Sequence, residues 1–417
     1  MQTKCPSPAR LWFLALTAAM GGFLFGYDTA VINGAEQQIQ SAWSLSSFQH
    51  GWVMSAALWG TVLGALFGGK VTDRFGRKPT LFGIGALYLV SAVWSGLAGG
   101  PAELMIARFI GGLAVGCSSI AAPVYIAEIS PAERRGLLTA LFQFNVIFGM
   151  CVSQLVNWAL GGLGDLAWRV MLGAEAVPAF LFTALTPFLV ESPRWQAMRS
   201  GCVANPQGDD AKFFTRANLR PILIAFLVAF FNQLSGINVV LYFAKRIFMM
   251  AGADDSRALA IVAGMGVVNA LATGLGVALI DRLGRRTLLI LGGSGYVISL
   301  FACAAAFLFD QGGLAAAMVF LFVVSHMIGQ GTVIWVLIAE VFPTRFRAQG
   351  QALGSFTHWF LAAVLAFLFP MLAANFPPAA IFGAFGVMTV FHLLWAIFFV
   401  PETKGRPLDE SATRGQP

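Results

Sequence analysis

The chain has 417 residues, of which 58% are hydrophobic and only 11% are charged, and its formal net charge is +7. Soluble domains are about 45–50% apolar and about 25% charged, so this composition excludes a water-soluble globular protein and indicates a chain that resides in lipid. About 20 apolar residues cross a bilayer, so the length allows roughly a dozen spans and little else. The positive charge does not require a nucleic acid partner, because basic residues also mark the cytoplasmic loops of membrane proteins.

Twelve apolar segments follow one another along the sequence. The first begins at Leu11 and is too long for the apolar region of a cleaved signal peptide. The segments cover residues 11–35, 50–70, 79–98, 102–127, 136–160, 168–190, 219–248, 256–280, 287–309, 314–341, 348–373 and 379–400. We therefore expect an all-α membrane protein with twelve transmembrane helices, divided into an N-terminal six-helix half (1–190), a short cytoplasmic linker (191–218), a C-terminal six-helix half (219–400) and a cytoplasmic tail (401–417).

The distribution of Lys and Arg predicts the orientation of the spans. If the N-terminus is cytoplasmic, only four of the 26 basic residues face the outside, namely Arg169, Lys245, Arg246 and Arg257. Arg108 lies within a span, and all the others lie in cytoplasmic segments. With an even number of spans, both termini are then expected in the cytoplasm.

The two halves of the chain repeat three charged motifs. D-R-F-G-R-K (73–78) recurs as D-R-L-G-R-R (281–286), and Y-I-A-E recurs as L-I-A-E. The third match, an acid after the last span of each half, is looser. The matching acids are Asp73 and Asp281, Glu128 and Glu340, and Glu191 and Glu402. In all three pairs the two copies are separated by nearly the same number of residues, about half the chain length. This repeat indicates two six-span halves of parallel orientation, as in major facilitator transporters.

The repeated motifs are expected to form ion pairs at the cytoplasmic ends of the spans. Their arginines are in reach of Glu128 and Glu340, and such bridges would latch the two halves on the inside. The charges alone would also satisfy the positive-inside rule, but their recurrence with matching acids favours the latch. The candidate cytoplasmic gate comprises Asp73, Arg74, Arg77, Glu128, Arg135, Glu191, Arg194, Asp281, Arg282, Arg285, Glu340, Arg347 and Glu402.

Eight motifs occur in one order along nearly the whole chain. They are G-Y-D-T-A-V (26–31), D-R-F-G-R-K (73–78), R-F-I-G-G-L-A-V-G (108–116), P-V-Y-I-A-E (123–128), E-S-P-R-W (191–195), Q-L-S-G-I-N (233–238), D-R-L-G-R-R (281–286) and P-E-T-K-G (401–405). A chain with these motifs in this order resembles the sugar porter family of the major facilitator superfamily. Within that family it is most similar in type to the bacterial proton-coupled symporters. The resemblance implies a location in the bacterial inner membrane and no cofactor, with the proton as coupling ion.

One acid, Asp28, lies within the first apolar segment. An ionisable group inside a span costs about 2.5–3.5 kcal/mol, so it points to a functional site. Counting about 1.5 Å per residue places Asp28, Arg108 and Glu175 at one depth, roughly 10 Å below the outer boundary. Burial of a lone acid favours its protonated form and a nearby arginine favours the carboxylate, so a moving Arg108 would switch a proton on and off Asp28. A static ion pair is the alternative, whereas the resemblance implies proton coupling for all three residues.

A layer of uncharged polar side chains is expected near the middle of the membrane. Amides donate and accept hydrogen bonds, which suits the hydroxyls of a sugar, and aromatic rings supply apolar faces for its ring. Such amides alternatively only join helices, at about 0.6–2 kcal/mol each. The resemblance implies the sugar site for Gln143, Gln233, Asn238 and Trp335. The candidate substrate-binding residues are Phe25, Gln143, Gln233, Asn238, Tyr242, Asn269, Trp335, His358 and Trp359.

Several positions depart from the family pattern. Asn232 replaces the first of two paired glutamines, His358 stands where an amide often precedes the tryptophan, and Gln330 stands where proline is usual. A histidine hydrogen-bonds as an amide does, but it also titrates. The central loop, residues 191–218, is shorter than is usual in the family. The three substituted positions affect the choice of sugar or the gating and leave the class of protein unchanged, whereas the short loop is either a natural short form or an engineered deletion.

The predicted function is the symport of a monosaccharide, hexose or pentose, with a proton by alternating access. A passive sugar facilitator and a transporter-like sugar sensor are the alternatives. No enzyme activity and no metal site are expected, because the four histidines show no metal-ligand spacing and the five cysteines are scattered. The expected partners are a monosaccharide, a proton and the lipid bilayer, without nucleic acid, and a monomer suffices for this mechanism.

Overall fold

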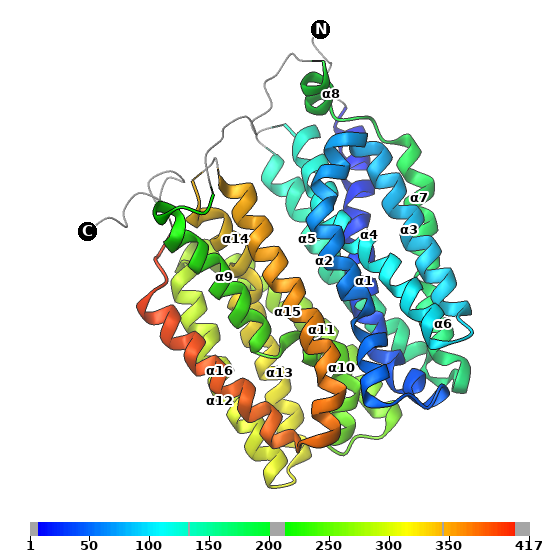
Figure 1. The fold of residues 1–417 in the computed structure, drawn as a ribbon, viewed down its shortest axis with the longest axis vertical. Coiled ribbons are helices and arrows are strands. Elements are labelled where there is room, and N and C mark those ends of the chain that lie inside the picture. The colour runs from blue at the N-terminus through cyan, green and yellow to red at the C-terminus, as the bar shows by residue number, and fades with distance from the viewer. Residues whose placement is uncertain (1–6, 132–133, 201–212, 344–345, 405–417) are drawn as a thin grey trace. The chain divides into compact units, whose positions relative to one another are not determined.

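Every regular element that the computed structural model describes is a helix (Figure 1). The described residues are 7–131, 134–200, 213–343 and 346–404. The helices are α1 (Pro8–Ala42), α2 (Ser47–Phe75), α3 (Arg77–Leu97), α4 (Pro101–Ile129), α5 (Arg135–Leu160), α6 (Ala167–Ala174), α7 (Ala176–Leu185), α8 (Pro193–Arg199), α9 (Leu219–Leu234), α10 (Ile237–Met250), α11 (Asp255–Leu283), α12 (Arg285–Leu308), α13 (Gly312–Ile328), α14 (Gln330–Val341), α15 (Arg347–Asn375) and α16 (Pro378–Phe398). The predicted all-α fold is therefore confirmed.

Eleven helical stretches among the described residues are long and apolar enough to cross a bilayer. One of them, Arg135–Phe188, has 54 residues, more than twice the roughly 20 that a span needs. It contains two predicted segments, 136–160 and 168–190. Gly164, whose φ is 65° and therefore left-handed, interrupts the helix between them. All twelve predicted segments are thus helical.

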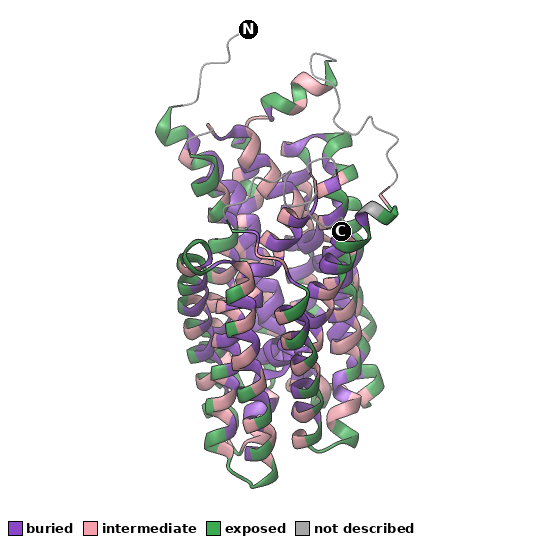
Figure 2. Ribbon diagram, turned by 90° about the vertical axis from the view of Figure 1, so that its left-hand side faces the viewer, coloured by how far each residue is buried: buried purple, intermediate pink, exposed green. Residues whose placement is uncertain are grey.

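Large apolar side chains are exposed along most of the helices. Leu97 is 75% exposed, Val177 is 74% exposed and Leu271 is 69% exposed. Soluble monomers rarely expose extended apolar patches, whereas lipid tails solvate such side chains. Figure 2 shows exposed and buried residues next to each other along individual helices. This surface is the one that a membrane protein requires.

The chain divides into two compact units, of which the first comprises Met1–Ser44 and Trp52–Gln207 and the second comprises Leu45–Gly51 and Gly208–Pro417. Each unit has its own apolar core, which includes Tyr125 in the first unit and Phe342 in the second. The second unit includes the short segment Leu45–Gly51, which lies within the predicted N-terminal half. Its Phe48 ring packs edge-on against Phe367 of α15, with the ring centroids 5.6 Å apart.

Three of the predicted continuous spans are interrupted inside. At Glu175, between α6 and α7, φ and ψ remain helical at −59° and −24°, and the interruption is the hydrogen bond that the ring nitrogen of Pro178 cannot donate. Gly236, with φ of 84°, separates α9 from α10 in the left-handed conformation that glycine adopts readily. Gly329, with ψ of −105°, separates α13 from α14. Transporters use such breaks to present main-chain polar groups to their substrates.

Candidate functional site

A buried cluster of three charged side chains lies in the first unit. Asp28 on α1 is 1% exposed, and Arg108 on α4 and Glu175 at the α6–α7 break are each 2% exposed. The Arg108 guanidinium donates to the Asp28 carboxylate at 2.5 Å and to the Asp28 main-chain oxygen at 3.0 Å. The Glu175 carboxyl lies within hydrogen-bonding range of the Asp28 carboxyl and within electrostatic range of Arg108. The structure thus brings together the three residues that were predicted at one depth.

The cluster contains one cation and two acids. With both acids ionised it would carry one uncompensated negative charge in apolar surroundings, which is strongly unfavourable. One bound proton makes the cluster neutral. Oε1 of Glu175 has no hydrogen-bond partner among the residues that the structure describes. The arrangement can therefore hold one exchangeable proton between two neighbouring carboxyl groups.

Two polar residues that sequence reasoning missed lie around the acids. Tyr88 of α3 is buried within electrostatic range of Asp28 and Glu175, and its hydroxyl lies beside Ser118 of α4. A Cβ at Gly111 of α4 would lie 2.5 Å from Ser91 Oγ and 3.3 Å from Asp28 Oδ1, so a glycine there allows α4 to approach both polar groups closely. Tyr88 and Ser118 are polar residues inside predicted spans, which is the feature that could have identified them. Hydroxyl groups are common in such spans, however, so this feature does not distinguish these two residues from the others.

A network of uncharged polar side chains lies in the second unit. Gln233 of α9 donates from Nε2 to Asn232 Oδ1 at 2.9 Å, and its Oε1 accepts from Asn238 Nδ2 of α10 at 2.8 Å. Both ring nitrogens of His358 on α15 also lie close to Gln233 Nε2, at 3.0 and 3.2 Å. In a continuous helix Gln233 and Asn238, five positions apart, would face different directions. The break at Gly236 therefore creates this contact.

Two tryptophans lie against the histidine of this network. The ring centroids of Trp335 on α14 and Trp359 on α15 are 5.2 and 4.8 Å from that of His358. The structure thus brings together two amides, one imidazole and two indoles of the predicted sugar site. These groups supply hydrogen-bonding partners and apolar ring faces side by side, as a sugar requires.

The other predicted sugar-site residues lie elsewhere in their units. Tyr242 of α10 and Asn269 of α11 are buried in the second unit, and Oδ1 of Asn269 has no hydrogen-bond partner within the described ranges. Phe25 of α1 is half-buried and Gln143 of α5 is exposed, and both belong to the first unit. The candidate sugar residues are therefore divided between the two units.

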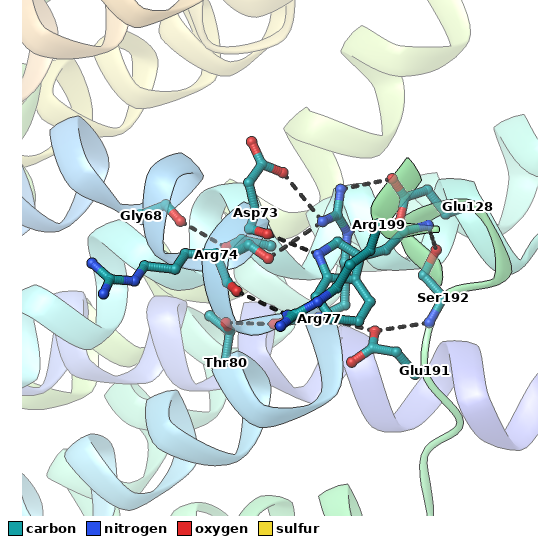
Figure 3. Close-up of polar contacts among 12 residues, drawn as sticks. Gly68, Asp73, Arg74, Arg77, Thr80, Glu128, Glu191, Ser192 and Arg199 are labelled. Carbon is teal, nitrogen blue, oxygen red and sulfur yellow. Dashed lines mark hydrogen bonds and ion pairs between the residues drawn. The ribbon is translucent and has the colours of Figure 1, made fainter. Parts of the chain in front are cut away.

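Arg77 is the centre of an ion-pair network in the first unit, at the α2–α3 turn (Figure 3). Its guanidinium donates twice to the Glu128 carboxylate, at 2.8 and 2.9 Å, and lies 3.2 Å from the Asp73 carboxylate. Glu191 accepts from the main-chain N–H groups of Arg77 and Lys78, at 2.9 and 3.3 Å. A carboxylate is favourable at this position because the first N–H groups of a helix have no partner within it.

The second unit repeats this network around Arg285. Its guanidinium donates to Glu340 at 3.0 and 2.9 Å and to Asp281 at 2.9 Å. Glu402 accepts from the main-chain N–H groups that begin α12, at 3.0 and 3.1 Å. The expected pairs of arginine and glutamate therefore form. The expectation that these bridges latch the two halves is wrong, because both partners of each bridge lie in the same unit.

Glu402, which lies beyond the last span, has a shifted pKa. Burial alone would raise the pKa of this carboxyl, but main-chain N–H groups donate to its charged form, and together they hold the pKa below its ordinary value. The donating groups belong to Lys404, Arg285, Arg286 and Thr403. The charged carboxylate is thus the form that caps α12.

Five further gate candidates make main-chain contacts or face outward. Arg135 donates to the main-chain oxygen of Ala127 at 3.1 Å, and Arg347 donates to that of Ala339 at 3.0 Å. The main-chain oxygen of Arg74 accepts from Arg199 at 3.5 Å, and that of Arg282 accepts from Lys404 at 2.7 Å. Arg194 is exposed on α8. The contacts of Arg135 and Arg347 are equivalent, which extends the repeat to a fourth pair of positions.

The family model described as "Sugar (and other) transporter" matches the chain twice, over residues 14–204 and 203–414. This chain belongs to that sugar transporter family. The D-xylose-proton symporter of Escherichia coli strain K12 is 31% identical to this sugar transporter, over 98% of the chain and 96% of the relative. The D-xylose transporter of Levilactobacillus brevis is 32% identical, over 95% and 94%.

A solved structure agrees with these relatives. The crystal structure of a D-xylose-proton symporter superimposes on this sugar transporter with a TM-score of 0.84 at 33% identity, and the match covers 95% of this chain and 99% of that one. The sugar transporter therefore has the predicted major facilitator fold and is a multi-span membrane protein, not an enzyme. Its bacterial symporter relatives agree with a location in the inner membrane.

Proposed function

We propose that this protein carries a monosaccharide, hexose or pentose, together with one proton into the cell by alternating access. The single observation that carries the proposal is the buried cluster in which one arginine faces two acids. Relatives named for D-xylose and proton symport support it. In this proposal both termini are cytoplasmic, and a single chain performs the whole cycle.

The proton is bound and released at the charged cluster. Arg108 balances one carboxylate, and the second carboxyl holds the proton that keeps the site neutral. When Arg108 moves away from Asp28, the two acids lose their common counter-ion and hold the proton more firmly. A conformational change that moves α4 against α1 therefore changes the proton affinity of the cluster.

The sugar is bound by the amides and the imidazole of the second unit. Asn238 and His358 offer hydrogen-bonding groups, and the indole of Trp335 offers an apolar face to the sugar ring. A neutral layer of this kind suits an uncharged ligand, because no charged group has to lose its water when the sugar binds. The proton cluster is then a separate site that does not contact the sugar.

The Asp28→Asn variant tests this proposal in proteoliposomes. Asparagine retains the shape of the side chain but does not ionise, so the variant is expected to lose sugar accumulation driven by a pH gradient. Exchange of labelled against unlabelled sugar requires no net proton movement and is expected to persist. Uptake of labelled D-xylose is measured in both modes, and a panel of competing monosaccharides identifies the preferred sugar.

The control is Asp165→Asn, which removes an exposed acid of the same unit and is expected to accumulate sugar as the unaltered protein does. Accumulation that survives in Asp28→Asn would contradict the role of Asp28. If the unaltered protein never raises the internal sugar concentration above the external one, a passive facilitator would be favoured.

A further inference from the structure

The buried face of α3 carries hydroxyl groups in its second half. Tyr88, Ser91 and Ser95 follow one another on this face, and all three are buried. Positions three and four apart lie on one side of a helix, about 5–6 Å from each other. Before Tyr88 the same face is apolar at Leu81, Ile84 and Gly85. A hydroxyl file (Tyr88, Ser91 and Ser95) therefore extends from the middle of α3 to its last turn.

The middle of this hydroxyl file lies beside the proton cluster. A Cβ at Gly111 would lie 2.5 Å from Ser91 Oγ and 3.3 Å from Asp28 Oδ1, so the two oxygens flank one point. One water molecule spans such a pair, since its two hydrogen bonds together cover roughly 5.5–6 Å. Ser91 is thus the hydroxyl of α3 through which water can reach the acids.

The other end of the hydroxyl file lies near the end of the helix. Ser95 is in the last turn of α3, and Gly99, one turn further, is exposed. The Arg169 guanidinium of α6 donates to the main-chain oxygens of Gly96 and Ala98, at 3.4 and 2.6 Å, and fixes this end of α3. With cytoplasmic termini, as proposed above, this end faces the outside of the cell.

The two serine hydroxyls do not bind their own helix. Neither Ser91 Oγ nor Ser95 Oγ has a hydrogen-bond partner within the described residues, and neither has Oε1 of Glu175. Thr80, nearer the start of the same face, instead donates to the main-chain oxygen of Gly76 at 2.6 Å. A buried polar group without a partner costs about 1–3 kcal/mol, and ordered water commonly satisfies such groups. The two serines and the acid are therefore expected to bind water.

The second unit provides an internal comparison. Tyr296, Ser299 and Cys303 of α12 are separated from Tyr88, Ser91 and Ser95 by the same number of residues as Asp281 is from Asp73. Ser299 donates to the main-chain oxygen of Gly295 at 2.6 Å, as a serine does that only packs within a helix bundle. Of these two equivalent serines, the one beside the acids is the one without a partner among the described residues.

We infer that Ser91 and Ser95, with water molecules between them, form the path along which protons reach Asp28 and Glu175 from the outer end of α3. The inference rests on the proposed proton symport and adds an entry route to its proton site. A hydronium ion at the outer end gives up one proton and becomes water. Each hydroxyl or water along the path accepts one proton and passes one on, so none stays charged. The last transfer forms an O–H bond on a carboxylate of the cluster.

The Ser91→Ala/Ser95→Ala double variant distinguishes this path from a packing role. Alanine retains the close approach of α3 to α4 and removes both hydroxyls. In proteoliposomes under a pH gradient of fixed size, uptake of labelled D-xylose is expected to slow about tenfold at an external pH of about 8, where protons are scarce. The rate should recover towards that of the unaltered protein at about pH 6, because the supply of protons rises. Exchange of labelled against unlabelled sugar needs no net proton movement and is expected to persist.

Ser299→Ala is the matched control, because it removes the equivalent buried hydroxyl of α12. It is expected to leave both modes of transport unchanged. Ser95→Cys is a milder second variant, which carries the residue found at the equivalent position of α12. A thiol is a weak hydrogen-bonding group, so proton-driven uptake at about pH 8 is expected to slow in this variant too.

Uptake at the unaltered rate in the folded double variant at about pH 8 would overturn the inference while proton symport stands. Equal losses of uptake and exchange at every pH would assign the serines a packing role and would also overturn it. A loss of proton-driven uptake in Ser299→Ala that matches the loss in the double variant would have the same meaning. Absence of proton-driven accumulation in the unaltered protein would overturn the proposed function and this inference together.

Discussion

Arg108 contacts Asp28 in a way that only an arginine side chain allows. Two nitrogens of its guanidinium reach the carboxylate and the main-chain oxygen of the same residue. A lysine ammonium is a single point charge on a flexible chain and does not present two donors in a fixed plane. The arginine therefore fixes the geometry of the cluster as well as its charge.

Replacement of Arg108 by Lys retains the charge and removes this geometry. We expect proton-driven uptake to fall at least about tenfold, since a hydrogen bond to a charged group is worth about 1.5–3 kcal/mol. The measurement is the initial rate of labelled sugar uptake under a pH gradient. Arg257→Lys, at an exposed position with a local ion pair to Asp254, is the control and is expected to transport normally. Equal rates in both variants would mean that Arg108 acts through its charge alone.

At the residue scale, the sequence predicts charged groups better than neutral ones. Asp28, Arg108 and Glu175 stand out because ionisable residues inside apolar spans are rare and expensive. Tyr88 and Ser118 beside them do not stand out, because hydroxyl groups occur throughout apolar helices. The pairing of Gln233 with His358 joins residues far apart in sequence, so only the folded structure reveals it.

At the element scale, the positions of the helices follow from the apolar segments, but the breaks within them do not. Pro178, Gly236 and Gly329 mark the three breaks. The chain has 46 glycines, and many of them allow close packing of continuous helices. Composition alone does not separate a glycine that packs from one that ends a helix.

Gly236→Ala tests the importance of the break between α9 and α10. A Cβ at this position would require a left-handed residue, at roughly 1–2 kcal/mol, and would lie 2.6 Å from the Phe385 ring. We expect a lower thermal unfolding temperature and slower sugar uptake. The matched control is Gly264→Ala on α11, where a Cβ would meet no atom within 4 Å. If the two variants behave alike, the break needs no glycine.

At the scale of the whole molecule, the internal repeat predicts one charged network in each unit, and the structure contains both. Arg77 with Glu128 and Arg285 with Glu340 occupy equivalent positions. The predicted halves, 1–190 and 219–400, already place Arg77 with Glu128 and Arg285 with Glu340. What only the structure shows is that each arginine binds the glutamate of its own half and no acid of the other within the described residues.

The acids that cap α3 and α12 are expected to stabilise their units equally. Glu402→Gln replaces a charged cap by a neutral one and should lower stability by about 0.3–1 kcal/mol at neutral pH. Because the folded pKa of Glu402 lies below its ordinary value of 4.5, the stabilisation is present above that pH and is lost as the pH falls through the folded pKa. Thermal unfolding of both proteins should therefore differ at pH 7 and converge in acid. A difference that grows in acid would contradict this assignment, and Glu191→Gln is expected to match Glu402→Gln at neutral pH.

In the proposed symport, one proton crosses the membrane with each sugar. The most direct measurement is the pH around de-energised cells or proteoliposomes when the transported sugar is added. The unaltered protein is expected to alkalinise the medium by one proton per sugar, and Asp28→Asn is expected to cause no change. Verified sugar entry without any change in the pH of the medium would contradict proton symport.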